Sequence, residues 1–403
     1  MRKQSDIFSQ EIEDIIVETN RSGNFHFQVG LDMSAITPLI ERVADAHAVF
    51  ASVPQLPQIA MEMEWEVLVS SVFGTNTIEG GTMSETEIGE IFRKDSQVEE
   101  ITTERERRVV NLKRAYEHVD LLARNREDGV EDPNGISFLL SEELIIELHE
   151  LITGGLTHPS NKPGRYRNNT RQAETVVGDP AHGGIYTPPK CLEDIQKLMK
   201  HYIQWINSDY MLGQHPLVRA PLAHYYFKRI HPFYDGNGRI GRLIEALLVK
   251  CSGMPLAHHA LSRAYLEHID GYFLVFNTSR KLEKKEREVA NTPFVEYFLN
   301  RLREVFFSLH FRVNQLLGVV LYENHVSSCY REGDINGRQF MIINNLLPRG
   351  TGHALRSVQT QPWYTGMYEK LTRKTRDRDL RNLAELGLVS VQDRELKLLV
   401  FGQ

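Results

Sequence analysis

The sequence predicts a mainly α-helical protein that carries one β-hairpin and ends in a winged-helix-like domain. Three observations predict this fold class. Apolar residues recur at helical spacing through most of the chain, one glycine-rich segment interrupts the helices, and shorter elements follow after about residue 324. The 403 residues, 41% hydrophobic and 25% charged, suit a globular protein of about two or three domains.

The helical spacing predicts a series of long helices. Ser84 and Glu87 form a capping-box pattern before the apolar positions of one helix. Pro216 suits the first turn of another, because proline lacks an N–H that a helix start leaves unpaired. The segments with helical spacing are 34–53, 59–73, 104–124, 141–152, 191–207, 216–230, 239–251, 262–279 and 289–316.

The segment from Gly164 to Lys190 breaks this pattern. It contains turn residues, paired glycines and two β-prone pieces, 174–177 and 184–187. We expect a β-hairpin on a long loop. Long loops inside compact helical domains are more often functional than idle.

The last part of the chain differs from the rest in having more glycine and shorter predicted elements. Helical spacing at 337–347 and 365–371 precedes a basic segment and two β-like stretches around a turn at 392–394. Helix, helix and hairpin in this order predict a winged helix, with a boundary near 325–333. The densest basic cluster of the chain lies in its second helix and consists of Arg373, Lys374, Arg376, Arg378 and Arg381.

Charge and cysteine usage restrict the class of protein. The formal charge of -6 argues against a surface that is basic all over, as in a protein that coats nucleic acid. Cys191, Cys251 and Cys329 are far apart and odd in number, which indicates a reducing compartment. The N-terminus lacks an apolar signal region, and no run of about 18 apolar residues is present. We therefore expect cytoplasmic localisation and no membrane partner.

The stretch HPFYDGNGRIGR, from His231 to Arg242, contains several candidate catalytic and binding residues close together. Its glycines match the G-x-G-x-x-G pattern of dinucleotide-binding folds, which requires a preceding strand and an acidic residue about 20 positions later. The preceding segment has helical spacing, and the next acidic residue after position 261 is Glu267. The stretch does not match a calcium-binding EF-hand loop either, because Ile240 and Ala246 occupy the positions at which that loop requires glycine and glutamate.

The same residues suit a phosphate site between two helices. Gly236 and Gly238 let backbone N–H groups turn toward an anion at a helix N-terminus. A carboxylate beside such a site, Asp235, requires a bridging divalent cation, and Mg²⁺ prefers its oxygen ligands. Arg239 and Arg242 lie three positions apart and reach neighbouring phosphates of a triphosphate.

His231 completes this set, because an imidazole at the end of the preceding helix can take up a proton at neutral pH. A base, a cation ligand, an anion nest and two arginine clamps indicate phosphoryl or nucleotidyl transfer. The alternative is a helix-linking turn with a surface histidine and a solvated arginine face.

The stretch resembles the signature H-P-F-x-[DE]-G-N-G-R-x-x-R of Fic domain proteins and fits it without a gap. The resemblance extends to HPLVRAPLAHYYFKRI before the motif and to GGIYTPPK, which looks like the family's flap, over roughly residues 60–320. It implies a Fic-type helical bundle with a β-hairpin flap.

The resemblance implies transfer of AMP from the co-substrate ATP to a Tyr, Ser or Thr hydroxyl of a target protein, with release of pyrophosphate. It implies His231 as the catalytic base and Asp235 as the Mg²⁺ ligand. Gly238 stands where phosphorylating Doc relatives have lysine, which favours adenylylation. The implied ATP-phosphate contacts are Gly236, Asn237, Gly238, Arg239 and Arg242.

The segment TNTIEG, from Thr75 to Gly80, is similar to the family's inhibitory motif [ST]-x-x-x-E-[GN]. Glu79 would pair with Arg242 and occupy the clamp for the γ-phosphate, so the enzyme would be built in an off state. The alternative is an exposed i, i+4 pair of Thr75 and Glu79 on a helix. In some relatives the same glutamate is linked to removal of AMP.

The flap of the family docks a target segment, which implies Gly184, Ile185 and Tyr186 as docking residues. A merely structural hairpin is the alternative. Tyr265 and Tyr272 lie at helical spacing, which is more typical of core packing than of adenine binding.

We expect three domains. Residues 1–100 form an N-terminal helical region with an inhibitory helix around 70–80, residues 101–325 form the Fic catalytic core, and residues 326–403 form the winged-helix-like domain. Its basic helix suits DNA phosphates, whereas the interleaved acidic residues Asp377 and Asp379 favour a solvated face or a homodimer contact.

The sequence thus predicts a Mg²⁺- and ATP-dependent protein adenylyltransferase that is autoinhibited by Glu79 and acts on a partner protein and on itself. One alternative is a DNA-binding regulator with a nucleotide-sensing Fic-like domain. The others are removal of AMP and transfer of another phosphate-containing group.

Overall fold

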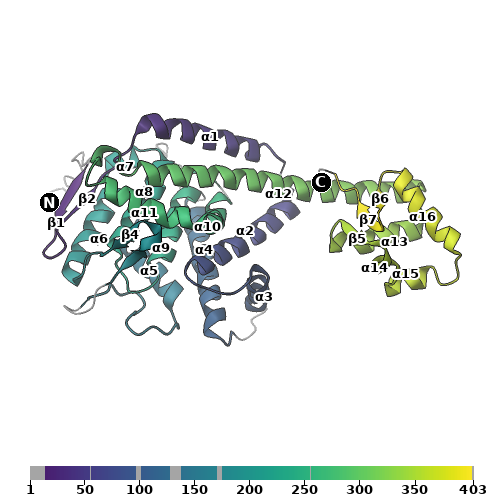
Figure 1. The fold of residues 1–403 in the computed structure, drawn as a ribbon, viewed down its shortest axis with the longest axis horizontal. Coiled ribbons are helices and arrows are strands. Elements are labelled where there is room, and N and C mark those ends of the chain that lie inside the picture. Colours follow the sequence, from purple (N-terminus) through teal and green to yellow (C-terminus); the bar gives the residue numbers. More distant parts are fainter. Residues whose placement is uncertain are drawn as a thin grey trace, which may run out of the picture. The chain divides into compact units, whose positions relative to one another are not determined.

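The computed structural model describes residues 14–54, 56–96, 101–127, 138–169, 175–254 and 256–401 (Figure 1). The chain divides into two compact units, of which unit 1 contains 1–52 and 60–309, and unit 2 contains 53–59 and 310–403. The ranges 1–100, 101–325 and 326–403 remain a prediction. Helix α12 (Thr292–Glu332) passes position 325 without a break.

Unit 1 is mainly helical, as predicted. Its centre is the helix pair α8 (Pro216–Ile230) and α9 (Asn237–Cys251), most of whose residues are buried. The two helices approach closely because Gly241 lacks a side chain, and a Cβ there would lie 2.5 Å from Cδ2 of His224. The other helices are α1 (Met33–Ala51), α2 (Pro57–Ile78), α3 (Glu85–Ser96), α4 (Glu104–Glu127), α5 (Glu142–Thr153), α6 (Leu192–Ile206), α7 (Asp209–Leu212), α10 (Ala257–Glu267), α11 (Ile269–Leu282) and the first part of α12.

Local signals set several helix ends in unit 1. The predicted capping box is confirmed, because the N–H of Ser84 donates to Oε2 of Glu87 at 2.7 Å and the N–H of Glu87 donates to Oγ of Ser84 at 3.3 Å. Pro216 opens α8, as predicted.

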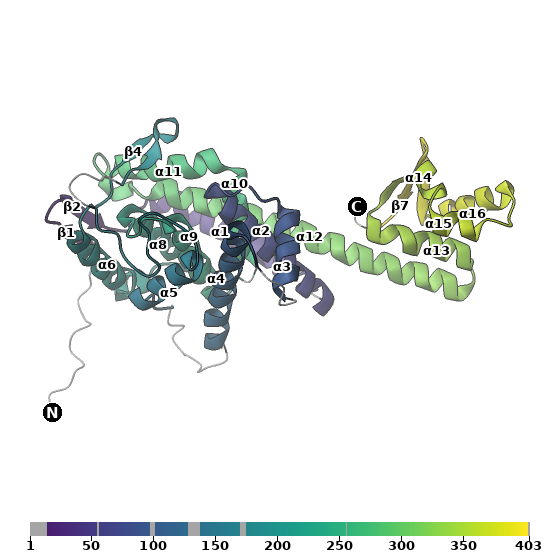
Figure 2. The same cartoon turned by 90° about the horizontal axis from the view of Figure 1, so that it is seen from below.

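The packing of α1 depends on residues far along the chain. Helix α1 runs beside the first part of α12, where the rings of His47 and Phe306 have centroids 5.0 Å apart (Figures 1 and 2).

A β-hairpin near the N-terminus was not expected from the sequence. It pairs β1 (Ile15–Glu18) with β2 (Asn24–Phe27) in antiparallel order. Phe27 is fully buried, with ring centroids 5.7 Å from Trp205 and 5.3 Å from Tyr226. Burial against aromatic residues far along the chain stabilises these short strands, so local pattern alone did not indicate them.

The structure contains the predicted flap hairpin, formed by β3 (Val177–Asp179) and β4 (Gly184–Tyr186) and joined by a 3₁₀ turn at Pro180–His182. The second strand lies where it was predicted, whereas the first begins at Val177, where the predicted strand 174–177 ends. Position 174, where the first strand was expected to begin, lies outside the described residues. Nδ2 of Asn277, on α11, donates to the carbonyls of His182 at 2.8 Å and Gly184 at 2.9 Å. The flap is therefore attached to α11, beside which β4 lies in Figure 2.

Unit 2 combines short helices with a small sheet. Its strands follow the order β5-β7-β6 and are all antiparallel. The predicted final turn is confirmed, with Asp393 and Arg394 at φ 49° and 66°. The winged-helix assignment remains a prediction. The elements of unit 2 are the second part of α12, α13 (Gly337–Leu346), β5 (Gly352–Ala354), α14 (Leu355–Gln359), α15 (Pro362–Met367), α16 (Arg373–Glu385), β6 (Val389–Gln392) and β7 (Glu395–Leu398).

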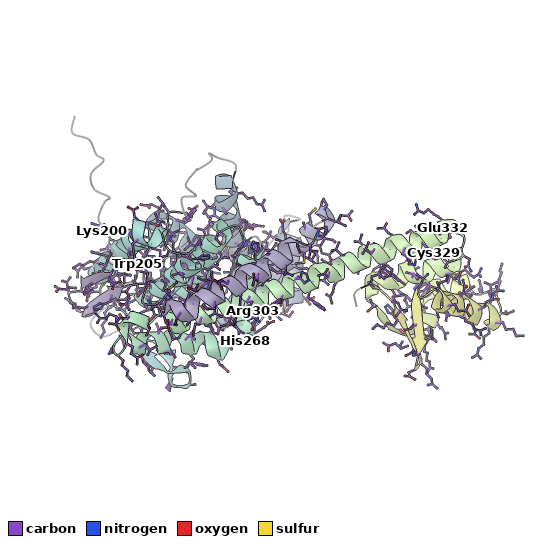
Figure 3. All side chains as sticks on the ribbon, turned by 90° about the horizontal axis from the view of Figure 1, so that it is seen from above. Lys200, Trp205, His268, Arg303, Cys329 and Glu332 are labelled. Atoms are coloured by element: carbon purple, nitrogen blue, oxygen red, sulfur yellow. The ribbon has the colours of Figure 1, made fainter. Side chains whose placement is uncertain are left out.

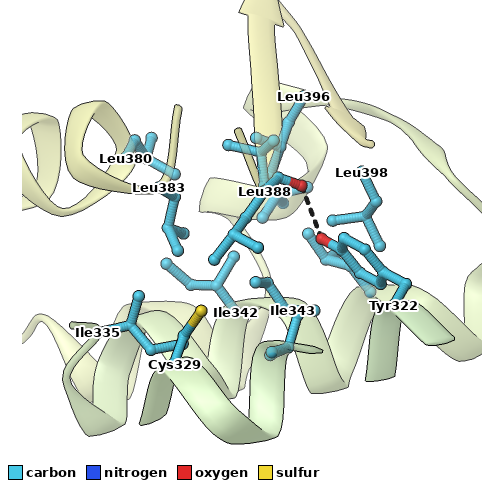
Figure 4. Close-up of a cluster of buried hydrophobic side chains, with 14 of the residues drawn as sticks. Tyr322, Cys329, Ile335, Ile342, Ile343, Leu380, Leu383, Leu388, Leu396 and Leu398 are labelled. Carbon is cyan, nitrogen blue, oxygen red and sulfur yellow. Dashed lines mark hydrogen bonds between the residues drawn. The ribbon is translucent and has the colours of Figure 1, made fainter. Parts of the chain in front are cut away.

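One hydrophobic cluster holds unit 2 together (Figure 4). Ile342 and Ile343 on α13 and Leu383 on α16 are fully buried in it. The hydroxyl of Tyr322 donates to the carbonyl of Leu388 at 2.6 Å, so the buried phenol is satisfied. This cluster fixes α16 by its apolar face.

By length and composition alone, one described segment meets the criterion for a membrane span. Residues 287–332 contain an 18-residue window of mean hydropathy 1.3, of which 39% is buried. Core helices of soluble proteins meet the same criterion, so this is weak evidence. Polar residues interrupt the stretch, so it contains no continuous apolar run of the kind that the sequence was searched for.

Candidate functional site

His231 ends helix α8 in an unusual backbone conformation. Its φ of 53° and ψ of 59° lie in the left-handed region, and its N–H donates to the carbonyl of Phe227 at 3.0 Å. Non-glycine residues reach this region at a cost, which the surrounding structure must offset. The fully buried Arg167 contributes, because its Nε donates to the carbonyl of His231 at 2.6 Å. Sequence analysis missed Arg167, which lies in the irregular segment before the flap.

The loop between α8 and α9 is clamped by Asn237. Its Oδ1 accepts from the N–H of Phe233 at 2.9 Å, and its Nδ2 donates to the carbonyl of Phe233 at 2.8 Å. The side chain of Asn237 thus holds the loop. The first N–H groups of α9 have no acceptor within the helix, so the backbone at 237–239 is what offers donors to an anion.

Asp235 and Arg239 form the local ion pair of the site. Nη2 of Arg239 lies 2.6 Å from Oδ2 of Asp235, and the N–H of Gly236 donates to Oδ1 at 2.7 Å. Burial would raise the pKa of Asp235, but Arg239, these hydrogen bonds and Arg108 hold it below its ordinary value. The carboxylate is charged and 37% exposed, and carboxylate oxygens are ligands that Mg²⁺ prefers.

Arg242 joins the motif to the end of helix α2. Its Nη2 lies 2.8 Å from Oε1 of Glu79, and its Nε donates to Oγ1 of Thr75 at 3.3 Å. The alternative of an exposed Thr75–Glu79 pair is wrong, because Thr75 is fully buried and Glu79 binds Arg242. Gly80, at φ 80°, ends the helix directly after this glutamate.

The carboxylate of Glu79 lies beside the start of α9, where Arg242 binds it. A Cβ atom on Gly238 would clash with its Oε1, so the carboxylate lies directly over the backbone of Gly238. Burial would raise the pKa of Glu79, but Arg242, Lys228 and Arg239 hold it below its ordinary value. Glu79 is therefore an anion at neutral pH, and it lies where an anionic ligand would bind.

A buried polar chain that sequence analysis missed supports Arg242 from behind. Nη1 of Arg242 donates to the hydroxyl of Tyr272 at 3.2 Å, and this hydroxyl lies 3.1 Å from Nε2 of His224. Nδ1 of His224 is 3.0 Å from Oε2 of Glu245, whose Oε1 accepts from Tyr265 at 2.7 Å. Tyr265 and Tyr272, for which core packing and adenine binding were both open, are buried.

A cavity of about 360 Å³ opens in front of these groups. His231, Glu79 and Gly238 line it on one side, and strand β3 with Tyr186 lines it on another. Ile185 is 54% exposed and lies outside this lining. The hydroxyl of Tyr186 donates to the carbonyl of Arg229 at 2.9 Å, which holds the flap near the end of α8.

The site is thus assembled from segments far apart in the sequence. It brings together His231, Asp235, the 236–239 backbone, Arg239, Arg242 and Glu79, and it places the flap across the cavity from them. Asp235, Arg239 and Arg242 lie outside the cavity lining, and Arg242 reaches it through Glu79. A helix N-terminus and a neutral histidine at the cavity wall suit a phosphate-containing ligand.

Comparison with known proteins agrees with this chemistry. The Fic/DOC family model matches residues 139–249. The protein adenylyltransferase Fic of Aedes aegypti is 26% identical over 215 residues, which cover 53% of this chain and 38% of that protein. The protein of the same name from Nematostella vectensis is 29% identical over 198 residues, 47% of this chain and 39% of that protein. The chain therefore spans about two fifths of the length of these relatives.

Solved structures share the fold. A Fic family protein from Desulfovibrio desulfuricans G20 superposes with a TM-score of 0.53 at 19% identity, covering 90% of this chain and 95% of that chain. A Fic domain containing signaling protein from Bacteroides thetaiotaomicron has a TM-score of 0.52 at 19% identity, with 69% and 96% coverage. The predicted helical fold with Fic character is thereby confirmed.

Proposed function

We propose that this chain, whose residues 139–249 form a Fic domain, is a Mg²⁺- and ATP-dependent protein adenylyltransferase held inactive by Glu79. One observation carries the proposal, namely the carboxylate of Glu79 on Arg242, beside the start of α9. A built-in anion at this place implies a ligand with an anionic group, for which a nucleotide triphosphate is the natural choice.

In the proposed reaction, the hydroxyl oxygen of a Tyr, Ser or Thr on the target attacks the α-phosphorus of ATP. The bond from this phosphorus to the bridging oxygen breaks and releases pyrophosphate, while His231 accepts the hydroxyl proton. Burial, with the charges of Arg167 and Lys228, lowers the pKa of His231 to about 3, so the imidazole is neutral and free to accept. Bound phosphates would raise this pKa and strengthen the base.

The remaining roles follow from the contacts. Arg242 binds the distal phosphates once Glu79 has left, and the backbone at 237–239 donates to the phosphate chain. Mg²⁺ at Asp235 would supply charge neutralisation for the phosphates. Arg239, which binds Asp235 in this structure, would be available to the phosphates if Asp235 held a metal ion.

The deciding experiment uses ATP labelled on the α-phosphate. We expect little label on any protein with the wild-type chain, and label on the chain itself or on a lysate protein with Glu79→Gly. Glu64→Gln, an exposed position on the same helix, serves as the matched control and should change nothing. EDTA should abolish the label. If Glu79→Gly gives no label in the presence of Mg²⁺, the proposal is wrong.

The same glutamate allows removal of AMP as the opposite activity. A target that carries AMP and loses it faster with the wild-type chain than with Glu79→Gly would favour that reaction. If mass spectrometry shows that the target protein gains a mass other than that of AMP, another group is transferred.

A second candidate function concerns DNA. Helix α16 exposes Arg373, Lys374, Arg378 and Arg381, whereas Asp379 faces inward and binds Arg338 at 2.8 Å. This basic surface supports a DNA-binding regulator in which the Fic domain senses a nucleotide. Sequence-selective, salt-sensitive DNA binding without AMP transfer would favour it. Cytoplasmic localisation and a homodimer stay proposals, to be tested by fractionation and by ultracentrifugation.

A further inference from the structure

The wall of the cavity holds the ammonium group of Lys228, a half-buried residue that the proposed reaction leaves unused. Lys228 lies on the last turn of α8, three residues before His231. Its Nζ lies 4.2 Å from the ring centroid of Phe276, 4.7 Å from that of Tyr272 and 5.3 Å from that of Phe273. Within the described part of the chain, no hydrogen bond or ion pair reaches this ammonium group.

This arrangement is costly for a lysine that has only a structural role. A cation removed from water loses solvation, and proteins normally offset that loss with an acidic partner. The faces of three aromatic rings offset part of it, yet they leave the N–H donors of the ammonium free for a ligand. An ammonium group that lines a cavity without a salt-bridge partner is typical of a functional group.

The other charged groups that line the cavity differ from Lys228 in this respect, because each one has a partner. The ion pairs and hydrogen bonds are Arg229 with Glu283, Glu79 with Arg242, Asp179 with His182, and Arg280 with Asn277. Lys228 is thus the cation at which an entering anion meets unused donors.

Lys228 also lies where a phosphate would be transferred. It lines the same cavity as His231 and Gly238, the proposed base and the start of the anion nest. Its charge lowers the pKa of both His231 and Glu79, which shows that all three groups share one electrostatic environment. A phosphate between the nest and the base lies beside this ammonium group.

We propose that Lys228 is a further catalytic residue, whose ammonium group binds the non-bridging oxygens of the phosphate that is transferred. The inference rests on the proposed function. The bonds formed and broken remain those given above, and the hydroxyl proton still goes to His231. Lys228 donates hydrogen bonds but no proton, and it offsets the charge that builds up on the phosphate oxygens in the transition state.

The experiment compares three variants in the Glu79→Gly background. Lys228→Met removes the charge and keeps an apolar side chain of similar length, and Lys228→Arg keeps the charge. Lys200→Met is the matched control, because Lys200 is exposed on α6 and does not line the cavity (Figure 3). We expect Lys228→Met to lower kcat/KM for label transfer on the order of 100-fold. Lys228→Arg should retain part of the rate, and Lys200→Met all of it.

The pH profile of kcat/KM separates catalysis from a structural role. Burial and Arg242 lower the pKa of Lys228 to about 7, against the opposing effect of Glu79. Removing Glu79 lowers this pKa further, so in the Glu79→Gly chain, where the protonated form binds phosphate, kcat/KM should fall as the pH rises and should do so below about pH 7. Lys228→Arg should lack this fall, because arginine stays charged.

A binding measurement keeps the test independent of the proposed reaction. Calorimetry with the non-hydrolysable α,β-methylene analogue of ATP should show weaker binding to Lys228→Met, whereas adenosine should bind it as it binds the parent. An unchanged kcat/KM in folded Lys228→Met overturns the inference. If no variant transfers label, the proposed function fails, and equal binding of the analogue to Lys228→Met and its parent overturns the inference as well.

Discussion

Helices α9 and α16 both carry arginines near their N-terminal ends, but these arginines have opposite surroundings. Arg239 and Arg242 of α9 are 1% and 2% exposed, and each binds a carboxylate. On α16, the side chain of Arg373 is 94% exposed and its contact to Asp377 is 3.9 Å long. Exposed pairs contribute little, whereas a buried charge strongly depends on its partner. The burial of an arginine and its partner thus decide how much it contributes to stability.

The largest expected effect concerns the base in front of α9. In the Glu79→Gly background, His231→Ala should lower label transfer by about 10²- to 10⁴-fold, because proton transfer from the target hydroxyl loses its acceptor. His201→Ala, on α6 and outside the cavity, is the control. Full activity of His231→Ala would remove histidine from the proposed mechanism.

The contrast between the two helices is tested most directly by one arginine from each. Arg242→Ala leaves Glu79 and Tyr272 without their buried partner and should lower the free energy of unfolding by about 3–5 kcal/mol. Arg378→Ala, exposed on α16, should stay within about 0.5 kcal/mol. Urea unfolding followed by tryptophan fluorescence measures both. Equal effects would contradict the contrast.

In unit 2 the apolar face of α16 should matter more than its charges. Leu383→Ala, at a fully buried position, should cost about 2–5 kcal/mol through the cavity that it leaves. Leu386→Ala, at a residue 39% exposed, should cost clearly less. Thermal unfolding followed by circular dichroism distinguishes the two. A similar loss for both would place Leu386 in the core as well.

The smallest effect is a pH dependence of stability in the α9 site. The folded protein lowers the pKa of Glu79, so the stability that this group contributes is present above its unfolded pKa of about 4.3 and is lost as the pH falls below it. The difference in urea midpoint between the wild type and Glu79→Gln should therefore be constant near pH 6 to 7 and shrink toward pH 3. A difference that grows in acid would mean that Glu79 is protonated in the folded state.

Much of the fold could be read from the sequence because its signals are local. Helical spacing, the capping box at Ser84 and the turn at Asp393 and Arg394 each depend on neighbouring residues, and the structure confirms them. The β1–β2 hairpin escaped prediction because its stability comes from Phe27 against Trp205, about 180 positions away.

The candidate site divides in the same way. The motif from His231 to Arg242 is contiguous, so its chemistry was visible in the sequence, whereas the role of Asn237 changed once both ends of its amide were found on Phe233. A lysine on a helix is usually solvated, and nothing local indicated that three aromatic rings surround Lys228.

By itself, the sequence located most of the helices and indicated the residues proposed to handle phosphate, since both signals depend on neighbours along the chain. It did not indicate the break at His268 between α10 and α11, because 262–279 was expected as one helix. Only the tertiary structure decided which charges meet. Glu79 and Arg242 are separated by 163 positions, and their contact exists because α2 ends against the start of α9. Packing excludes water from this contact. In such a low-dielectric environment, whether a charge stabilises or destabilises the fold depends on its partner.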